Sequence, residues 1–269
     1  MHLEAFLLAL LIYFALGIGA GLLSGLFGAG GGLVAVPGLM FVFQWESVDP
    51  ALAMHVAVGT SLAMMIPIAY RSLTSHIKLG VSFFPIYKEM APTVILGVIG
   101  GGILARFMHS NVLKIIFGIF VLVMAVSLLI KHKTTVERKL PGRKGMLLAG
   151  GFVGVQSGLL GVGGSSFSVP FLSHRGVSMH VAVVVSVAIA MTVSILGTIT
   201  FIFTGMNAAG LPHWSTGFVY WPAFIGLAVG GVLMAPWGAK LSHRISSDKL
   251  KKFFAVFLLV IAARMLWPV

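Results

Sequence analysis

The sequence predicts an all-α polytopic membrane protein made of two inverted repeats. Hydrophobic residues make up 58% of the 269 residues and charged residues only 9%. Apolar runs of about 18 residues or more, the length that a membrane-spanning helix needs, recur along the whole chain. A glycine-rich motif also occurs twice. We expect each repeat to contain a helix pair broken at a glycine loop, either broken across the membrane or re-entrant, followed by three full transmembrane helices.

The repeated motif runs from Ser24 to Pro37 and returns 133 positions later, from Ser157 to Pro170, with eight of fourteen positions identical. Clustered glycines weaken a helix, because glycine loses the most conformational entropy on ordering. The two prolines have a fixed φ that suits the first position of a new helix. Each copy therefore predicts a helix, an unwound glycine loop and a short second helix. The alternative is that the glycines only allow close helix packing.

The first repeat is expected to cover residues 1–133. Its opening apolar stretch, Leu3 to Phe27, leads into the first glycine loop, and the short helix that Pro37 begins reaches only to about Phe43. Such a helix, at about 1.5 Å per residue, covers roughly a third of the hydrocarbon core. It is therefore a half-helix that either re-enters or completes a broken span. Three full spans are expected next, at 50–73, 84–107 and 112–130.

A polar linker at 134–144 separates this half from the second repeat, at 145–269. The order of elements then recurs. A helix from 145 to 160 precedes the second glycine loop, and Pro170 to Leu172 form the second short helix. Three full spans are expected at 177–203, 216–241 and 250–267.

The distribution of Lys and Arg predicts the orientation. If each glycine-loop helix and its short partner return the chain to its starting side, each half crosses the membrane an odd number of times and the halves are inverted. Of the 18 Lys and Arg residues, 15 then share one side, and only Arg106, Lys114 and Arg264 lie on the other. Positive charge favours the cytoplasmic side, so we expect a cytoplasmic linker and both termini outside.

The same composition excludes several classes of function. Membrane topology explains the net charge of +12, so we expect the lipid bilayer as a partner and no RNA or DNA. The chain has no cysteine, which rules out disulfides and thiolate chemistry. The histidines and methionines are scattered without metal-ligand spacing, and no nucleophile with a nearby base or phosphate loop is present. We expect no metal, no cofactor and no enzymatic activity.

Several short motifs resemble those of the TauE/SafE family of sulfite exporters, also called the 4-toluene sulfonate uptake permease family, over nearly the whole chain. They are Gly28 to Pro37, Gly161 to Pro170, Gly59-Thr60-Ser61, His76 with Gly80, and Pro212 to Gly217. The resemblance implies transport of sulfur-containing anions, such as sulfite or organosulfonates, across the bacterial inner membrane. The second motif departs from the first where Ser165 stands in place of Gly32, so strict equivalence of the two loops is in doubt.

The two glycine loops form the predicted substrate site. Two half-helices related by an inverted two-fold bring their N-termini together near the midplane, where unpaired N–H groups attract an anion. Serine hydroxyls and the Gln156 amide add donors for an oxyanion, which only accepts hydrogen bonds. Alternatively, the serines only satisfy neighbouring helix carbonyls. The predicted substrate-binding residues are Ser24, Gly28, Gly30, Gly31, Gly32, Gln156, Ser157, Gly161, Gly163, Gly164, Ser165 and Ser166.

A second group of residues is considered for gating or coupling. His55 and His180 occupy matching places in the two repeats and are candidates for proton carriers or anion donors, the alternative being an interfacial position near the helix start. His76 follows on the cytoplasmic side, and Arg71 closes the same span, where it could simply reach lipid phosphates. Glu89 is the carboxylate that falls inside an expected span, unless it pairs with the neighbouring lysine at the interface. The remaining candidates are Thr60, Ser61 and Ser186.

The leading functional prediction is a secondary transporter of a small sulfur oxyanion, sulfite or an organosulfonate, with export as the expected direction. A passive anion channel and a structural membrane subunit are the alternatives. Unwound backbone at membrane depth favours transport, because a scaffold gains nothing from it. The residues alone leave the substrate, the direction, the coupling ion and the oligomeric state open, a homodimer included.

Overall fold

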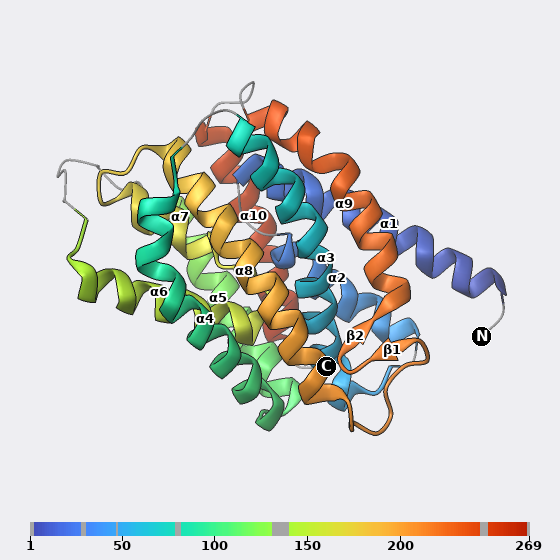
Figure 1. The fold of residues 1–269 in the computed structure, drawn as a ribbon. Helices are drawn as coiled ribbons and strands as arrows, with labels where there is room; N and C mark the ends of the chain where they lie inside the picture. Colours follow the sequence, from blue (N-terminus) through green and yellow to red (C-terminus); the bar gives the residue numbers. More distant parts are fainter. Residues whose placement is uncertain are drawn as a thin grey trace.

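The computed structural model describes residues 3–27, 31–46, 48–78, 82–130, 140–242 and 247–267. In this part of the chain helices dominate, with one short β-hairpin between α8 and α9 (Figure 1). The elements are α1 (Leu3–Phe27), α2 (Gly32–Trp45), α3 (Pro50–Lys78), α4 (Phe84–Phe107), α5 (Ser110–Leu129), α6 (Arg143–Leu160), α7 (Ser165–Ser173), α8 (Met179–Gly205), β1 (Ser215–Thr216), β2 (Val219–Tyr220), α9 (Trp221–Ser242) and α10 (Ser247–Leu266).

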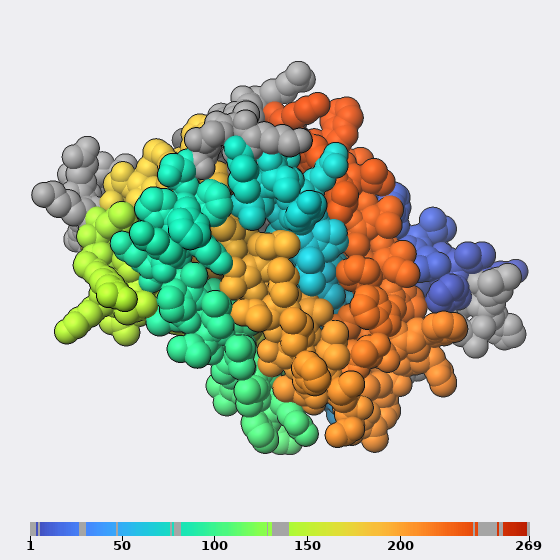
Figure 2. All heavy atoms as spheres, viewed as in Figure 1, coloured from blue at the N-terminus to red at the C-terminus, as the bar shows by residue number. Residues whose placement is uncertain are grey.

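Six of the described helices, α1, α3, α4, α5, α8 and α9, are long and apolar enough to cross a membrane. Large apolar side chains such as Leu96, Phe107 and Val123 are exposed on α4 and α5, where lipid would cover them. Figure 2 shows α4, α8, α3 and α9 side by side across one face of the molecule. The expectation of an all-α polytopic membrane protein is confirmed.

The two halves of the chain interlace instead of packing as separate bundles. Helix α1 packs along α9, and correspondingly α6 packs along α4 (Figure 1). Helix α3 packs against α8, and α5 against α10. In the sequence repeat, α1 corresponds to α6, α3 to α8, α4 to α9 and α5 to α10. The pair α1–α9 therefore corresponds to the pair α6–α4, and the pairs α3–α8 and α5–α10 each correspond to themselves. The packing thus follows the sequence repeat.

Glycines permit the close approach of the interlaced helices. A Cβ atom added at Gly21 of α1 would lie 2.3 Å from the carbonyl oxygen of Gly231 in α9. A Cβ added at Gly154 of α6 would lie 2.4 Å from the carbonyl oxygen of Val94 in α4. No side chain fits at such distances, so backbone packs on backbone, as small residues allow between membrane helices. For these helical glycines, close packing is the role that the structure supports.

The expectation that Pro37 and Pro170 begin the short helices is wrong. Helix α2 begins at Gly32 and α7 at Ser165, so each proline is the sixth residue of its helix. The first four N–H groups of a helix have no helical partner, which lets a helix start directly after the glycines, and the proline then removes only one later hydrogen bond. Helix α2 has 14 residues and α7 has nine. Both remain shorter than the roughly 20 residues that cross a bilayer.

The span expected at 216–241 also begins later than predicted, because its first residues form the β1–β2 hairpin. Gly217 has a φ of +57°, and a Cβ there would lie 2.1 Å from the carbonyl oxygen of Ile202. The Phe218 amide donates to the Phe201 carbonyl at 3.2 Å. The hairpin is therefore held against the last turns of α8, and the apolar residues Phe218 to Tyr220 resemble a helix start only in composition.

Candidate functional site

The start of α2 and the second glycine loop meet beside the central part of α3. The Ser61 hydroxyl donates to the carbonyl oxygen of Gly161 at 3.0 Å. A Cβ at Gly32 would lie 2.0 Å from that same carbonyl oxygen and 3.0 Å from Ser61 Oγ. Ser61 is the twelfth residue of the 29-residue α3, so this contact lies well inside the span. Residues from both predicted loops therefore come together, and Ser61 joins them.

The second glycine loop has a backbone that only glycine adopts readily. Gly161, Gly163 and Gly164 have φ values of +68°, +77° and +75°, in the left-handed region that side chains disfavour. Gly164 is the N-cap of α7, and its carbonyl accepts the first helical hydrogen bond, from the Ser168 amide at 3.2 Å. Among the preceding amides, that of Ser165 donates to the Gly163 carbonyl at 2.9 Å, whereas those of Ser166 and Phe167 have no acceptor within their own helix. The helix dipole gives this end positive character.

Three polar side chains beside this loop are buried and have no hydrogen-bond partner among the residues that the structure describes. Both amide atoms of Gln156 are unpaired, and so are the hydroxyls of Ser157 and Ser166. These side chains are between 0% and 7% exposed. An unpaired buried polar group costs about 1–3 kcal/mol, and membrane surroundings supply no water to pair it. Unpaired donors on both sides of one loop are what a ligand with acceptor atoms would satisfy.

Other buried serines near the loop have protein partners. The Ser168 hydroxyl donates to the Gly164 carbonyl at 2.9 Å and lies 2.8 Å from the Ser186 hydroxyl. Ser186 in turn donates to the Ala182 carbonyl at 2.7 Å. Ser165 is buried in the first turn of α7. Satisfaction of helix carbonyls thus accounts for Ser168 and Ser186, whereas Ser157 and Ser166 lack such partners.

The first loop differs from the second. Gly28 and Gly30 lie outside the described residues. Gly31, the N-cap of α2, has a φ of −56°, whereas its counterpart Gly164 has +75°. Ser24 is half-buried and lines a cavity of about 10 Å³ between α1, α3 and α8, which has room for about one water molecule. The two loops are therefore not equivalent at Gly31 and Gly164, as the replacement of Gly32 by Ser165 in the second motif suggested.

His55 and His180 match in sequence but not in surroundings. His180 is exposed near the start of α8, as an interfacial residue would be. His55 is 4% exposed, and its Nε2 lies 3.0 Å from the carbonyl oxygen of Ala105 at the end of α4. The ring of Phe218 lies beside it, with ring centroids 5.1 Å apart. Helix α4 and the hairpin therefore cover His55 near the start of α3, whereas no described residue covers His180 in this way.

The remaining gating candidates divide by position. The Thr60 hydroxyl is buried and accepts from the Tyr220 amide at 3.0 Å, one residue before the Ser61 contact. Arg71 and Glu89 are exposed near the ends of α3 and α4. His76 belongs to α3, and its side chain is outside the part of the chain that the structure describes. Of these residues, the structure brings only Thr60 to the region where the loops meet.

Sequence reasoning missed a carboxyl group that the fold partly buries. The Tyr13 hydroxyl of α1 donates to Glu46 Oε2 at the end of α2, and the buried Glu46 Oε1 has no partner in the described part of the chain. Burial raises the pKa of Glu46 above its ordinary value, while the hydrogen bond from Tyr13 acts in the opposite direction. In the sequence, Glu46 only follows the short helix that was expected to end near Phe43. The 33 residues between it and Tyr13 left no local signal of the contact.

Comparison with known proteins identifies the family. The family model described as "Sulfite exporter TauE/SafE" matches residues 13–265. The chain belongs to the TauE/SafE family. A probable membrane transporter protein of Haemophilus influenzae is 32% identical over 257 residues, which cover 95% of this chain and 97% of that protein. Another, from Methanocaldococcus jannaschii, is 28% identical and covers 97% of both chains.

A third TauE/SafE relative, the probable membrane transporter protein YunE of Bacillus subtilis, is 25% identical over 97% of this chain and 98% of its own length. No solved structure matches this chain significantly. In the described residues, no group of three or more His, Cys, Asp or Glu side chains has the arrangement of a metal site. This TauE/SafE protein is therefore a multi-pass membrane protein of a transporter family.

Proposed function

We propose that this protein is a secondary transporter of small sulfur-containing oxyanions, sulfite or an organosulfonate, with export as its direction. The observation that carries the proposal is the set of unpaired buried groups, Gln156, Ser157 and Ser166, around a glycine loop that ends at a helix N-terminus. A sulfonate group or the sulfite dianion offers only acceptor oxygens, so these donors and the backbone amides are complementary to it. The name of the matching family, which specifies sulfite export, agrees with this chemistry.

Neutral donors suit a transporter because the empty site must also be stable. A lysine or arginine at this depth would be buried without a partner after the anion leaves, at a cost of several kcal/mol. Serine, glutamine and backbone amides carry no net charge, so the empty site needs no counter-ion. The described cations near spans, such as Arg71, Arg106 and Arg264, lie close to helix ends. Affinity should therefore come mainly from hydrogen bonds and helix dipoles.

Two contacts favour a carrier over a passive channel. Ser61 and Gly161 are hydrogen-bonded, and Gly32 packs against the same carbonyl, so protein atoms fill the space where the loops meet. A channel would need a continuous opening at this level, whereas a carrier closes it in each of its states. We include in the proposal that the repeats are inverted and exchange access to the loops between the two sides. The paired packing of α1 on α9 and α6 on α4 supports this arrangement.

Sulfite binding to purified variants tests the proposal. Ser166→Ala and Gln156→Leu each remove hydrogen-bonding groups that have no protein partner, so the free protein should stay folded while the anion loses contacts. A hydrogen bond to a charged group contributes about 1.5–3 kcal/mol, which corresponds to a Kd raised by about tenfold or more. Sulfite-dependent flux into proteoliposomes should fall in parallel. Saturation of the flux and its stimulation by sulfite on the opposite side would distinguish a carrier from a channel.

Ser127→Ala provides the matched control, because the exposed Ser127 hydroxyl donates only to the Met124 carbonyl of its own helix, α5. Its affinity and flux should equal those of the unaltered protein. Unchanged sulfite binding by both Ser166→Ala and Gln156→Leu would overturn the assignment of the glycine loop as the substrate site. Absence of flux for every sulfur oxyanion, with folded protein, would favour the structural subunit instead.

A further inference from the structure

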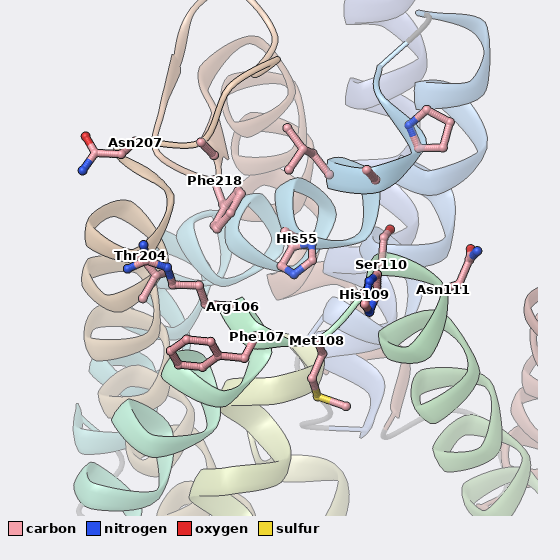
Figure 3. A pocket seen from close by; sticks show the side chains of 14 residues that line it. His55, Arg106, Phe107, Met108, His109, Ser110, Asn111, Thr204, Asn207 and Phe218 are labelled. Atoms are coloured by element: carbon pink, nitrogen blue, oxygen red, sulfur yellow. The ribbon is translucent and has the colours of Figure 1, made fainter.

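A second polar cavity lies away from the glycine loops, where two helices begin and two others end. It has a volume of about 570 Å³ and is open to the surface. Its walls come from the start of α3, the end of α4, the start of α5 and the end of α8, together with Phe218 of the hairpin (Figure 3). We name it the Arg106 pocket after its arginine. A cavity of this size would accommodate a small anion with several water molecules.

The polar side chains of the Arg106 pocket are donors or can act as donors. They are His55, Arg106, His109, Ser110, Asn111, Thr204 and Asn207. The Thr204 hydroxyl already donates to the Thr200 carbonyl at 2.8 Å, and Ser110 Oγ accepts from the Met54 amide at 3.2 Å. Neither Asp nor Glu is among the lining residues. The neighbouring carboxylate, Asp49, accepts a hydrogen bond from the Ala51 amide at 2.8 Å and so caps the start of α3. The pocket therefore combines positive charge with hydrogen-bond donors.

Two features show that donors are available to a ligand. Arg106 forms no hydrogen bond or ion pair within the described residues. Helix α5 begins at Ser110 without a side-chain cap, so the Ser110 and Asn111 amides have no partner in their own helix, whereas the Val112 amide donates to the His109 carbonyl at 2.9 Å. His55 is not a free donor, because its Nε2 donates to the Ala105 carbonyl and the neutral ring then offers Nδ1 as an acceptor. An anion would pair with Arg106 and the two amides.

We propose that the Arg106 pocket is a second binding site, selective for a small oxyanion, in which Arg106 supplies the principal charge and Asn207, Asn111 and the start of α5 supply further donors. The shared chemistry is a compact group with several charged oxygens. A free sulfur oxyanion carries this group, and so does the phosphate of a lipid head group at the membrane surface. The test below separates these two sources.

The position of the pocket links it to the substrate pathway, a step that rests on the proposed function. Phe218 forms part of its wall and packs against His55 on one side and Phe201 on the other, with ring centroids 5.1 and 6.2 Å apart. Six residues separate His55 from Ser61 along α3, which is roughly 9 Å of helix. The Arg106 pocket is thus a waiting site at one mouth of the pathway, separated from the glycine loops by Phe218.

The absence of native cysteines allows a direct test. A single cysteine at Asn207, an exposed lining residue, is alkylated in detergent with anionic iodoacetate or neutral iodoacetamide. Arg106 should favour the anionic reagent. Arg106→Gln should lower the ratio of the two rates by about threefold to tenfold, because it removes a positive charge from the same partly hydrated pocket. Arg264→Gln, which removes an arginine from the last turn of another helix, α10, should leave the ratio unchanged.

Protection experiments then identify the occupant. Sulfate or methanesulfonate at millimolar concentration should slow alkylation at position 207, and Arg106→Gln should remove this protection. Nanodiscs of phosphatidylglycerol and of phosphatidylcholine provide the lipid comparison. Protection by phosphatidylglycerol that added sulfate cannot increase would assign the site to lipid head groups, whereas protection by sulfate in both lipids would assign it to free anions.

The proposal would be overturned if Arg106→Gln left the ratio of the iodoacetate rate to the iodoacetamide rate unchanged. It would also be overturned if anions protected position 207 equally well with and without Arg106. Ser166→Ala should not change either readout, because it alters only the glycine loop. If the Arg106 pocket fails this test while sulfite transport and its dependence on Ser166 persist, only the second site is withdrawn. If protection at position 207 persists while transport fails, only the proposed transport function is withdrawn.

Discussion

Gly163 occupies a backbone conformation that determines which residue can stand there. Its φ of +77° lies in the left-handed region, where a Cβ atom costs about 1–2 kcal/mol. Gly163→Ala should therefore destabilise the protein by about that amount and reduce transport, since the loop must shift to relieve the strain. The measurements are thermal unfolding in detergent and flux in proteoliposomes. Gly100→Ala is the control, because a Cβ at Gly100 meets nothing within 4 Å. A fully active, equally stable Gly163→Ala variant would contradict this prediction.

The Glu46 carboxyl should make stability depend on pH. Its pKa is raised in the folded state from an ordinary value of 4.5, so the folded protein holds a proton that the unfolded chain releases as the pH rises above about 4.5. Stability should fall as the pH rises from there through the raised pKa. Glu46→Gln keeps an acceptor for Tyr13 and removes the titration. Its melting temperature should exceed that of the unaltered protein at neutral pH, with the difference vanishing below about pH 4.5.

Glu89→Gln, which alters an exposed carboxyl group of α4, serves as the control for this pH series. It should leave the pH dependence of the melting temperature unchanged. If Glu46→Gln follows the unaltered protein at every pH, the Glu46 carboxyl does not contribute.

Single residues also mark the limit of sequence reasoning about the site. The motif predicted that Gln156, Ser157 and Ser166 lie beside a glycine loop, and the structure places them there, buried. Which hydroxyls remain unpaired depends on neighbours distant in sequence. Ser168 finds Ser186, 18 residues away, whereas Ser166 finds no partner. No spacing rule distinguishes these two serines.

Among the elements, the crossing of α4 and α6 depends most clearly on glycine. A Cβ at Gly154 would lie 2.4 Å from a backbone carbonyl, which cannot rotate away as a side chain would. Gly154→Ala should therefore separate the helices and destabilise the protein by about 1–3 kcal/mol, the usual cost of overpacking. The melting temperature should fall, whereas Gly100→Ala in the same helix pair should have little effect. Equal melting temperatures for the two variants would show that the crossing relaxes without cost.

The hairpin element should control access from the Arg106 pocket to the glycine loops. Phe218 packs between His55 and Phe201, and truncation to Ala removes this barrier. A cysteine in place of Ser61 should then react with a water-soluble thiol reagent severalfold faster in the Phe218→Ala background than in the unaltered background. Phe218→Leu, which keeps a large apolar side chain at this position, is the control and should keep the slow rate. Equally slow reaction in all three would mean that another element closes the path.

At this scale, composition predicted the long helices well and the short elements less well. The stretches from Leu3 to Phe27 and from Phe84 to Phe107 were predicted with the bounds that the structure gives, because they are bordered by polar or glycine-rich residues. Proline misled the placement of α2 and α7, since it is tolerated within a helix as well as at its start. The hairpin was missed because Phe218 to Tyr220 are apolar and precede a true helix without a break in hydropathy.

For the whole molecule, orientation in the membrane is a prediction that rests on charge. The chain lacks cysteine, so one cysteine at Gly142 and, separately, one at Ala209 can be labelled from either side of the membrane. Both positions are exposed, the first before α6 and the second after α8. The division of Lys and Arg predicts labelling of position 142 only from the cytoplasm and of position 209 only from outside. Labelling of both from the same side would refute the inverted arrangement.

The interlaced packing has a consequence for how the chain is made. Helix α1 enters the membrane first, yet its glycine face meets α9 only after most of the protein has been synthesised. Until then the helix waits with its partner surface covered by lipid or by another membrane protein, and the nascent first half cannot acquire its final packing. The two halves expressed as separate polypeptides should consequently be degraded individually but accumulate when produced together. Assembly of this protein would then resemble the association of two subunits that happen to share one chain.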